Sequence, residues 1–129
     1  MHYLIDGYNL AHWLAQGLPH YDDLDPGQLR ELLLEALERR VPADAESLRI
    51  FWDVRRMHPG IPANEYLDWC SMHNVPDADA AIIDAVYDAD RPQRLVVVSR
   101  DREVTGKSRQ LGAKTRSPAE LLGKGRRRS

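Results

Sequence analysis

The sequence predicts an α/β fold, a three-layer α/β/α sandwich around a central and mainly parallel sheet. Three short apolar runs, at residues 2–6, 48–52 and 95–98, have the unbroken hydrophobic pattern of strands that are covered on both faces. Segments with helical periodicity separate these runs along the chain. Strands that alternate with helices in this way are typical of a parallel sheet with helices on both sides.

The length and composition indicate one compact domain. The chain has 129 residues, of which 43% are hydrophobic and 29% are charged. We predict a single domain over residues 1–122 and a basic, flexible tail over 123–129. No apolar stretch is long enough to span a bilayer and no signal peptide is evident, so we expect a cytoplasmic protein without a membrane partner. The single cysteine, Cys70, excludes an internal disulfide and suits a reducing compartment.

Each remaining element has its own local signal. Asp25 and Pro26 occupy the N-cap and first positions of a predicted helix over 26–40, in which leucines recur at helical spacing. A loop over 54–61 and a helix over 62–72 are predicted next. The later elements are a helix over 78–88, a helix over 101–110 ended by Gly112, a short strand around 113–115, and a last short helix opened by Ser117 and Pro118.

Aspartates follow all three predicted strands. One aspartate at such a position is most often a turn or helix-cap residue, but Asp6, Asp53 and Asp101 should meet at the carboxyl edge of one sheet, where ligands bind. Asp77 and Asp79 add two carboxylates at the start of the 78–88 helix. Carboxylates that share a crevice repel each other unless a cation neutralises them, and hard oxygen ligands select Mg²⁺ or Mn²⁺. The pattern therefore predicts a divalent-metal site suited to phosphodiester cleavage.

The charge is strongly segregated although the net charge is only −2. Residues 1–90 hold 6 Arg and Lys against 17 Asp and Glu, a net −11, whereas residues 91–129 hold 12 against 3, a net +9. Such segregation indicates nucleic-acid binding, and the arginine fork suits phosphate oxygens. The candidate nucleic-acid-binding residues are Arg55, Arg56, Arg100, Arg102, Lys107, Arg109, Lys114 and Arg116.

Several other function classes lack support. The sequence has no P-loop, GxGxxG, HExxH or GxSxG motif, so nucleotide kinase, dehydrogenase, zincin and serine hydrolase activities are not indicated. A phospho-acceptor receiver domain, with Asp53 as the acceptor, would need an acidic pair after its first strand. Here Asp6 is followed by Gly7 and Tyr8.

The opening LIDGYNL, residues 4–10, resembles the signature of NYN domains, which are PIN-like ribonucleases, and specifically their bacterial YacP-like branch. Later segments occur in the order that this branch shows. They are FWDVRR at 51–56, DAD at 77–79, VVSRDRE at 97–103 and SPAELL at 117–122. The resemblance covers about residues 2–122.

The resemblance implies a PIN-like, Rossmann-like sandwich and metal-dependent endoribonuclease activity with Mg²⁺ or Mn²⁺ as cofactor. It implies that Asp6, Asp79 and Asp101 are the metal ligands. The full set of catalytic candidates is Asp6, Asp53, Asp77, Asp79 and Asp101.

The resemblance also implies two supporting residues, Asn9 as a brace for the first turn and Ser99 as a small hydroxyl residue near the metal. The chain departs from the YacP-like pattern in two places. Residues 77–80 read Asp-Ala-Asp-Ala in place of Thr-Ala-Asp-Asp, and Arg100 replaces a usually small residue.

Two functions therefore remain open at this point. The first is an endoribonuclease, and the second is a catalytically silent PIN-like module that binds RNA or the ribosome. The sequence also leaves open whether the single-stranded RNA is messenger, ribosomal or transfer RNA, whether DNA can replace RNA, and whether the chain forms a homodimer.

Overall fold

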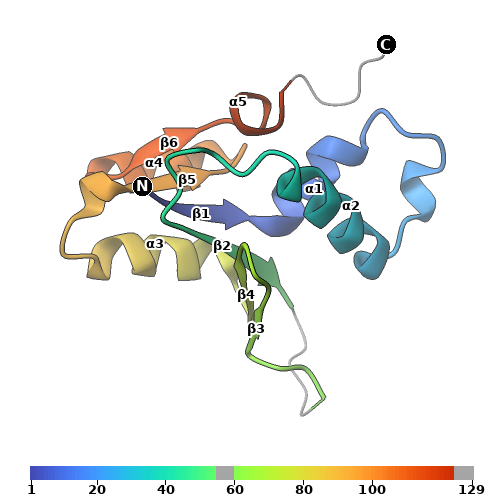
Figure 1. Cartoon of the computed structure of the whole chain (residues 1–129), viewed down its shortest axis with the longest axis horizontal. Helices are drawn as coiled ribbons and strands as arrows, with labels where there is room; N and C mark the ends of the chain where they lie inside the picture. Colours follow the sequence, from blue (N-terminus) through green and yellow to red (C-terminus); the bar gives the residue numbers. More distant parts are fainter. Residues whose placement is uncertain (55–59, 124–129) are drawn as a thin grey trace.

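A six-stranded sheet, in the strand order β3-β4-β2-β1-β5-β6, runs through the computed structural model, which describes residues 1–54 and 60–123 (Figure 1). All neighbouring strands are parallel except β3 and β4. The elements are β1 (His2–Asp6), α1 (Gly7–Ala15), η1 (Tyr21–Asp23), α2 (Pro26–Glu38), β2 (Ser47–Asp53), β3 (Asn64–Tyr66), β4 (Ser71–Val75), α3 (Ala78–Asp88), η2 (Pro92–Arg94), β5 (Leu95–Val98), α4 (Arg102–Gln110), β6 (Lys114–Arg116) and α5 (Pro118–Leu122). The predicted α/β class and mainly parallel sheet are confirmed.

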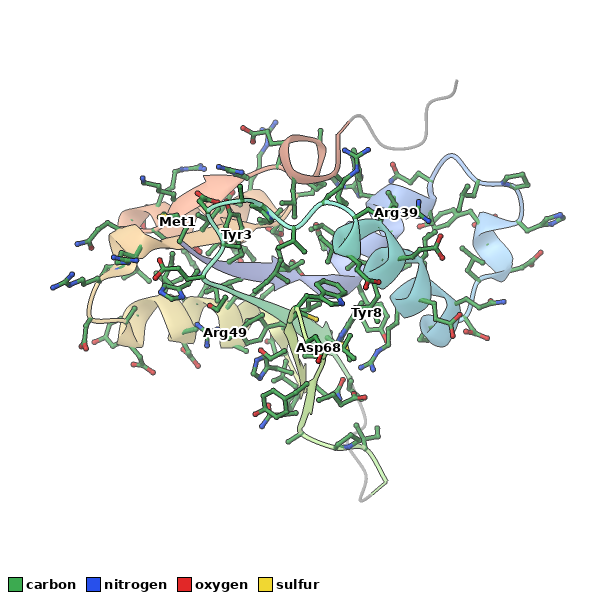
Figure 2. All side chains as sticks on the ribbon, viewed as in Figure 1. Met1, Tyr3, Tyr8, Arg39, Arg49 and Asp68 are labelled. Atoms are coloured by element: carbon green, nitrogen blue, oxygen red, sulfur yellow. The ribbon has the colours of Figure 1, made fainter. Side chains whose placement is uncertain are left out.

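Both faces of the sheet are covered because side chains alternate along each strand. Tyr3 and Ile5 of β1 enter the core that lies under α1, α2 and α5, whereas Leu4 enters the core under α3 and α4. In the same way Arg49 of β2 lies on the α3 side of the sheet and Tyr3 on the other (Figure 2). The unbroken apolar runs of the sequence reflect this two-sided burial.

Two helices begin at the capping residues that the sequence predicts. The Asp25 carboxylate accepts from the Gln28 backbone N–H while the Gln28 side chain accepts from the Asp25 backbone, a capping box with Pro26 at the first helical position. Ser117 and Glu120 make the same reciprocal pair at α5. These signals are local in sequence, so they indicate the helix starts without knowledge of the fold.

The predicted helix over 62–72 is wrong, because this segment forms β3 and the start of β4. β4 pairs in parallel with β2, and β3 folds back antiparallel onto β4, so that the two form a hairpin that projects from the rest of the molecule (Figure 1). The apolar residues that suggested a buried helix face include Tyr66 and Leu67, which are 74% and 44% exposed. Pairing with β2 therefore decides the backbone here, over the short apolar pattern.

Some predictions fall on residues that the structure does not describe. The loop over 54–61 contains residues 55–59, and all of the predicted tail except Gly123 also lies outside the described residues. Within residues 1–54 and 60–123, no helix combines the length and the apolar character needed to cross a bilayer.

Candidate functional site

Asp6 and Ser99 meet at the carboxyl edge of the sheet. In the parallel pairing of β1 with β5, Ile5 lies opposite Val98, so the next residue of each strand also lies side by side. The Ser99 hydroxyl donates a hydrogen bond to Oδ2 of Asp6 across 2.9 Å. Both residues are buried, with 6% of Asp6 and 3% of Ser99 exposed. A buried carboxylate of this kind is costly unless it is paired, so Asp6 is the centre of the candidate site.

Burial and neighbouring negative charges act together on Asp6. Its position two residues after Leu4 places it on the α3 and α4 face of the sheet. Burial raises the pKa of Asp6 to about 7, and the charges of Asp79, Asp101 and Asp53 contribute to the rise, while the hydrogen bond from Ser99 opposes it. The carboxyl group is therefore poised to lose its proton when a cation approaches.

Asp79 lies in the first turn of α3 and, like Asp6, is affected by burial and by neighbouring negative charges. Burial raises its pKa, and the charges of Asp101, Asp77, Asp53 and Glu103 add to the effect. The charges of the other predicted acids thus act on Asp6, on Asp79 or on both, and the charge of Glu103 acts on Asp79. We refer to these residues as the acidic cluster: Asp6, Asp53, Asp77, Asp79, Asp101 and Glu103.

Glu103 is a member that the sequence reasoning missed. It lies in the first turn of α4, two residues after the N-cap Asp101, and contributes to the raised pKa of Asp79. The available signal was its place beside Asp101 at the start of a helix that was already predicted.

Three of the acids also hold the backbone of the helices that begin at the site. Asp101 Oδ1 accepts from the backbone N–H groups of Glu103 and Val104 at 2.9 and 3.4 Å. Asp77 caps α3 by accepting from Ala80 N–H at 3.1 Å. Asp53 Oδ2 accepts from Ala78 N–H at 3.3 Å. The cap interpretation of such aspartates therefore holds for Asp77 and Asp101, and these bonds fix their carboxylates in place.

The acidic cluster fits Mg²⁺ or Mn²⁺ in its donor chemistry. It supplies only carboxylate oxygens together with the Ser99 hydroxyl, and its negative charges contribute to the raised pKa of Asp6 and of Asp79, as expected of an acidic site without a counter-charge. Among the described residues, however, no three His, Cys, Asp or Glu side chains converge closely enough to hold a metal ion. The fit thus lies in charge and ligand type, and the side chains do not form a closed coordination sphere.

Several arginines line a cavity of about 370 Å³ next to the acidic cluster. Arg100, Arg102, Arg109 and Arg116 line it, and none of the four forms an ion pair with another residue in the part of the chain that the structure describes. The remaining lining residues are Ser99, Thr105, Thr115, Ser117 and Glu120. We call this cavity the arginine groove. It suits phosphate groups, because guanidinium forks without a carboxylate partner bind phosphate oxygens in two-pronged geometry.

The structure brings together only some of the predicted basic residues. Lys107 of α4 and Lys114 of β6 are exposed but do not line the arginine groove. Arg55 and Arg56 lie outside the described residues. Within the groove, Arg109 Nη1 donates to Thr115 Oγ1 across 2.7 Å, which joins α4 to β6.

Asn9 and Gly7 hold α1 against the site. Asn9 Oδ1 accepts a hydrogen bond from the Arg100 backbone N–H across 2.8 Å. This bond links the start of α1 to the turn that contains Ser99. A Cβ atom at Gly7 would lie 2.5 Å from Cε3 of Trp52 and 2.8 Å from the Phe51 carbonyl oxygen. Glycine is therefore needed here to let α1 approach β2 closely.

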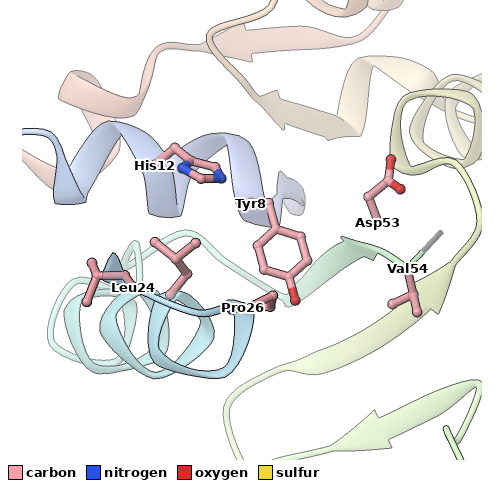
Figure 3. A pocket seen from close by; sticks show the side chains of 7 residues that line it. Tyr8, His12, Leu24, Pro26, Asp53 and Val54 are labelled. Atoms are coloured by element: carbon pink, nitrogen blue, oxygen red, sulfur yellow. The ribbon is translucent and has the colours of Figure 1, made fainter. Parts of the chain in front are cut away.

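A second cavity, of about 580 Å³, lies between α1 and the start of α2 and extends to Asp53 of the acidic cluster (Figure 3). Its lining residues are Tyr8, His12, Leu24, Pro26, Leu29, Asp53 and Val54. We call it the aromatic cavity. It shares Asp53 with the acidic cluster. No local pattern in the sequence indicates this cavity, because residues from three separate elements form it.

Comparison with known proteins bears on the fold. No family model matches the chain, and no curated protein matches it by sequence. Among solved structures, a single-substitution variant of Rae1 (YacP) from Bacillus subtilis matches with a TM-score of 0.63 and 19% sequence identity, over 95% of this chain and 73% of the other. The chain has a YacP-like fold. This agrees with the branch that its sequence motifs resemble.

Proposed function

We propose that this protein is a metal-dependent endoribonuclease that hydrolyses RNA phosphodiester bonds. Asp6, Asp79 and Asp101 would hold Mg²⁺ or Mn²⁺, with Asp53 or Asp77 assisting. The observation that carries the proposal is the position of Ser99, which hydrogen-bonds Asp6 and also lines the arginine groove. One side chain therefore connects the acidic cluster, which would bind a cation, to the arginine groove, which would bind phosphate.

The arginines would bind the phosphates of the RNA, and the acids would bind the cation. Arginine forks in the groove bind phosphates of the RNA strand and fix its path past Ser99. This places a phosphodiester beside the acidic cluster, whose excess negative charge would repel RNA without a cation. A divalent ion, when bound, supplies a Lewis acid that polarises the phosphodiester and neutralises the charge that develops on it.

A second candidate function is a silent module that binds RNA or the ribosome without cleaving it. Two observations favour it: the described acids do not close around a metal position, and Asp77 and Asp101 use carboxylate oxygens to cap helices. Such a module would need the arginine groove but not a filled metal site. The two candidates therefore make the same prediction for RNA binding and opposite predictions for cleavage.

Cleavage of a mixed-sequence single-stranded RNA separates the two candidates. The wild type is assayed with Mn²⁺ and with EDTA, and Asp6→Asn and Asp101→Asn are assayed with Mn²⁺. Asp84→Asn is the matched control, because Asp84 is an exposed aspartate of α3 outside the acidic cluster. The nuclease proposal expects cleavage in Mn²⁺ by the wild type and by Asp84→Asn only. An inert wild type that binds the RNA, with affinity that falls steeply as salt rises, would favour the silent module.

A further inference from the structure

We propose that the aromatic cavity binds the unpaired base of the RNA nucleotide whose phosphate lies at the acidic cluster. The inference rests on the proposed function, because it assigns the base next to the bond that would be cleaved. The cavity begins at Asp53, a member of the acidic cluster, and extends along α1 away from it (Figure 3).

The lining of the aromatic cavity suits a flat and uncharged group. Leu24, Leu29 and Val54 give it apolar walls, and the rings of Tyr8 and His12 project from successive turns of α1 (Figure 3). None of the described residues that line it is a lysine or an arginine. Its volume lies within the range of about 300–1,000 Å³ that is usual for small-ligand pockets. Phosphates would therefore be drawn to the arginine groove, and a base would enter this cavity.

The Tyr8 ring is held in place before any ligand arrives. Its hydroxyl accepts a hydrogen bond from Nε of Arg30 across 3.2 Å. Its ring contacts Trp52 edge to face, with 4.9 Å between the ring centroids and 64° between the planes. Trp52 is fully buried, and the Arg30 guanidinium lies 4.9 Å from its ring centroid. A ring fixed from two sides loses little conformational entropy when a base stacks on it.

His12 forms a second wall that is also supported. Its Nδ1 lies 2.9 Å from the Tyr21 hydroxyl, and the two rings make an edge-to-face contact at 5.9 Å. Unlike Tyr8, His12 is exposed, so it can be replaced without disturbing the core. The cavity thus presents two aromatic rings, one half-buried and one exposed.

The order of the strands places the three parts of the site in a row. Asp53 ends β2, Asp6 ends the neighbouring β1, and Ser99 follows β5 on its other side. Neighbouring strands are about 4.8 Å apart, so aromatic cavity, acidic cluster and arginine groove follow each other over a short distance along the sheet edge. An RNA segment that crosses this edge can place phosphates in the groove and a base in the cavity. A base inside a duplex cannot enter, so the site would take single-stranded RNA.

The test is a double-mutant cycle that measures binding of RNA in Ca²⁺, a cation that takes oxygen ligands and can neutralise the acidic cluster, and the RNA is checked to be intact after each measurement. Binding of a short oligoadenylate is compared with binding of a chain of the same length in which every base is absent, so that the phosphates are unchanged. Both are measured with wild type, Tyr8→Leu and Tyr87→Leu. Tyr87 is 73% exposed on α3 and lies outside the cavity, which makes it the matched control.

We expect the wild type and Tyr87→Leu to bind the oligoadenylate about tenfold more tightly than the abasic chain. In Tyr8→Leu this ratio should fall close to one, with little change in binding of the abasic chain. His12→Ala should also lower the ratio, and this variant keeps the test decisive if Tyr8→Leu does not fold. A ratio near one in the wild type, or an unchanged ratio in the folded cavity variants, would overturn the inference.

The outcomes also separate this inference from the proposed function. Base-dependent binding that Tyr8→Leu abolishes, together with an absence of cleavage in Mn²⁺, would overturn the nuclease and keep the base site. Cleavage in Mn²⁺ without any base-dependent binding would keep the nuclease and overturn the base site. An absence of RNA binding to the wild type would overturn both.

Discussion

The Ser99 hydroxyl donates its hydrogen bond to Asp6 across 93 residues of chain, and this single contact ties the first strand of the sheet to the turn that begins α4. The same hydroxyl accepts from the Asp101 backbone N–H at 3.1 Å. Ser99 therefore orients one proposed metal ligand directly and supports the turn that carries another.

Replacement of Ser99 by alanine should weaken both the fold and the proposed site. The change leaves the buried Asp6 carboxyl without its donor, so we expect a decrease of about 1–3 kcal/mol in the free energy of unfolding. Mn²⁺-dependent RNA cleavage should fall as well. Chemical denaturation and the cleavage assay check the two effects, and Ser47→Ala, at an exposed serine that starts β2, is the control. Unchanged stability would mean that the Asp6–Ser99 bond contributes nothing to the fold.

The stability of the metal-free protein should depend on the ionisation of Asp6. The pKa of Asp6 is raised from 3.8 to about 7 in the folded state, so between these pH values the folded protein keeps a proton that the unfolded chain has released. The stabilisation linked to this proton is complete below pH 3.8 and disappears as the pH rises to about 7. Its size can reach about 4 kcal/mol.

Asp6→Asn should therefore be more stable than the wild type at pH values above 7 in EDTA, and its stability should depend less on pH below that value. Thermal denaturation over this pH range measures both effects. Equal slopes for wild type and variant would show that Asp6 does not titrate with a raised pKa. Addition of Mn²⁺ should stabilise the wild type and leave Asp6→Asn unaffected.

The arginine groove should supply affinity that is independent of RNA sequence. Arg102→Ala removes one guanidinium from the groove, so binding should weaken to a similar degree for all single-stranded RNAs. The slope of log affinity against log salt concentration should become shallower by about one for each phosphate group that the variant no longer binds. Arg91→Ala is the control, because Arg91 is an exposed arginine of the same basic segment that does not line the groove. Equal effects from the two variants would argue against a localised phosphate site.

Because α1 approaches β2 closely at Gly7, replacement of this glycine should lower the stability of the fold. An added Cβ would overlap Trp52 and the Phe51 backbone, so Gly7→Ala should cost about 1–3 kcal/mol in the free energy of unfolding. Gly106→Ala in α4 is the matched control, because nothing lies within 4 Å of its added Cβ and alanine favours the helix by about 0.5–1 kcal/mol. Denaturation curves of the two variants should therefore shift in opposite directions. A shift of the same sign in both would contradict the packing argument.

Elements with local sequence signals were predicted correctly, and elements that depend on distant parts of the chain were missed. The capping boxes of α2 and α5 depend on residues three positions apart, and unbroken apolar runs mark the buried strands. β3 and β4 were missed because their backbone is determined by pairing between strands: β4 pairs with β2, which lies in an earlier part of the chain, and β3 pairs with β4. β3 has only three residues, and β4 carries polar residues at buried as well as half-buried positions, so neither has a strong strand pattern.

The candidate site also has a part that the sequence predicts and a part that depends on tertiary packing. The rule that ligands lie at the carboxyl ends of parallel strands predicted the neighbourhood of Asp6, Asp53 and Asp101 without the structure. The aromatic cavity depends on how α2 packs against α1, and on the support that Arg30 gives to Tyr8 across 22 residues. Contacts of this kind arise only from tertiary packing, so no short motif could indicate them.

Mn²⁺ binding measured by calorimetry, with RNA cleavage followed over the same Mn²⁺ concentrations, tests the central claim most directly. Wild type, Asp6→Asn and Asp84→Asn are compared. We predict that wild type and Asp84→Asn bind Mn²⁺ and cleave RNA as the metal site fills, and that Asp6→Asn does neither. Cleavage that persists in Asp6→Asn, or a wild type that binds no Mn²⁺ and leaves the RNA intact, would contradict the assignment of the acidic cluster as a metal-dependent nuclease site.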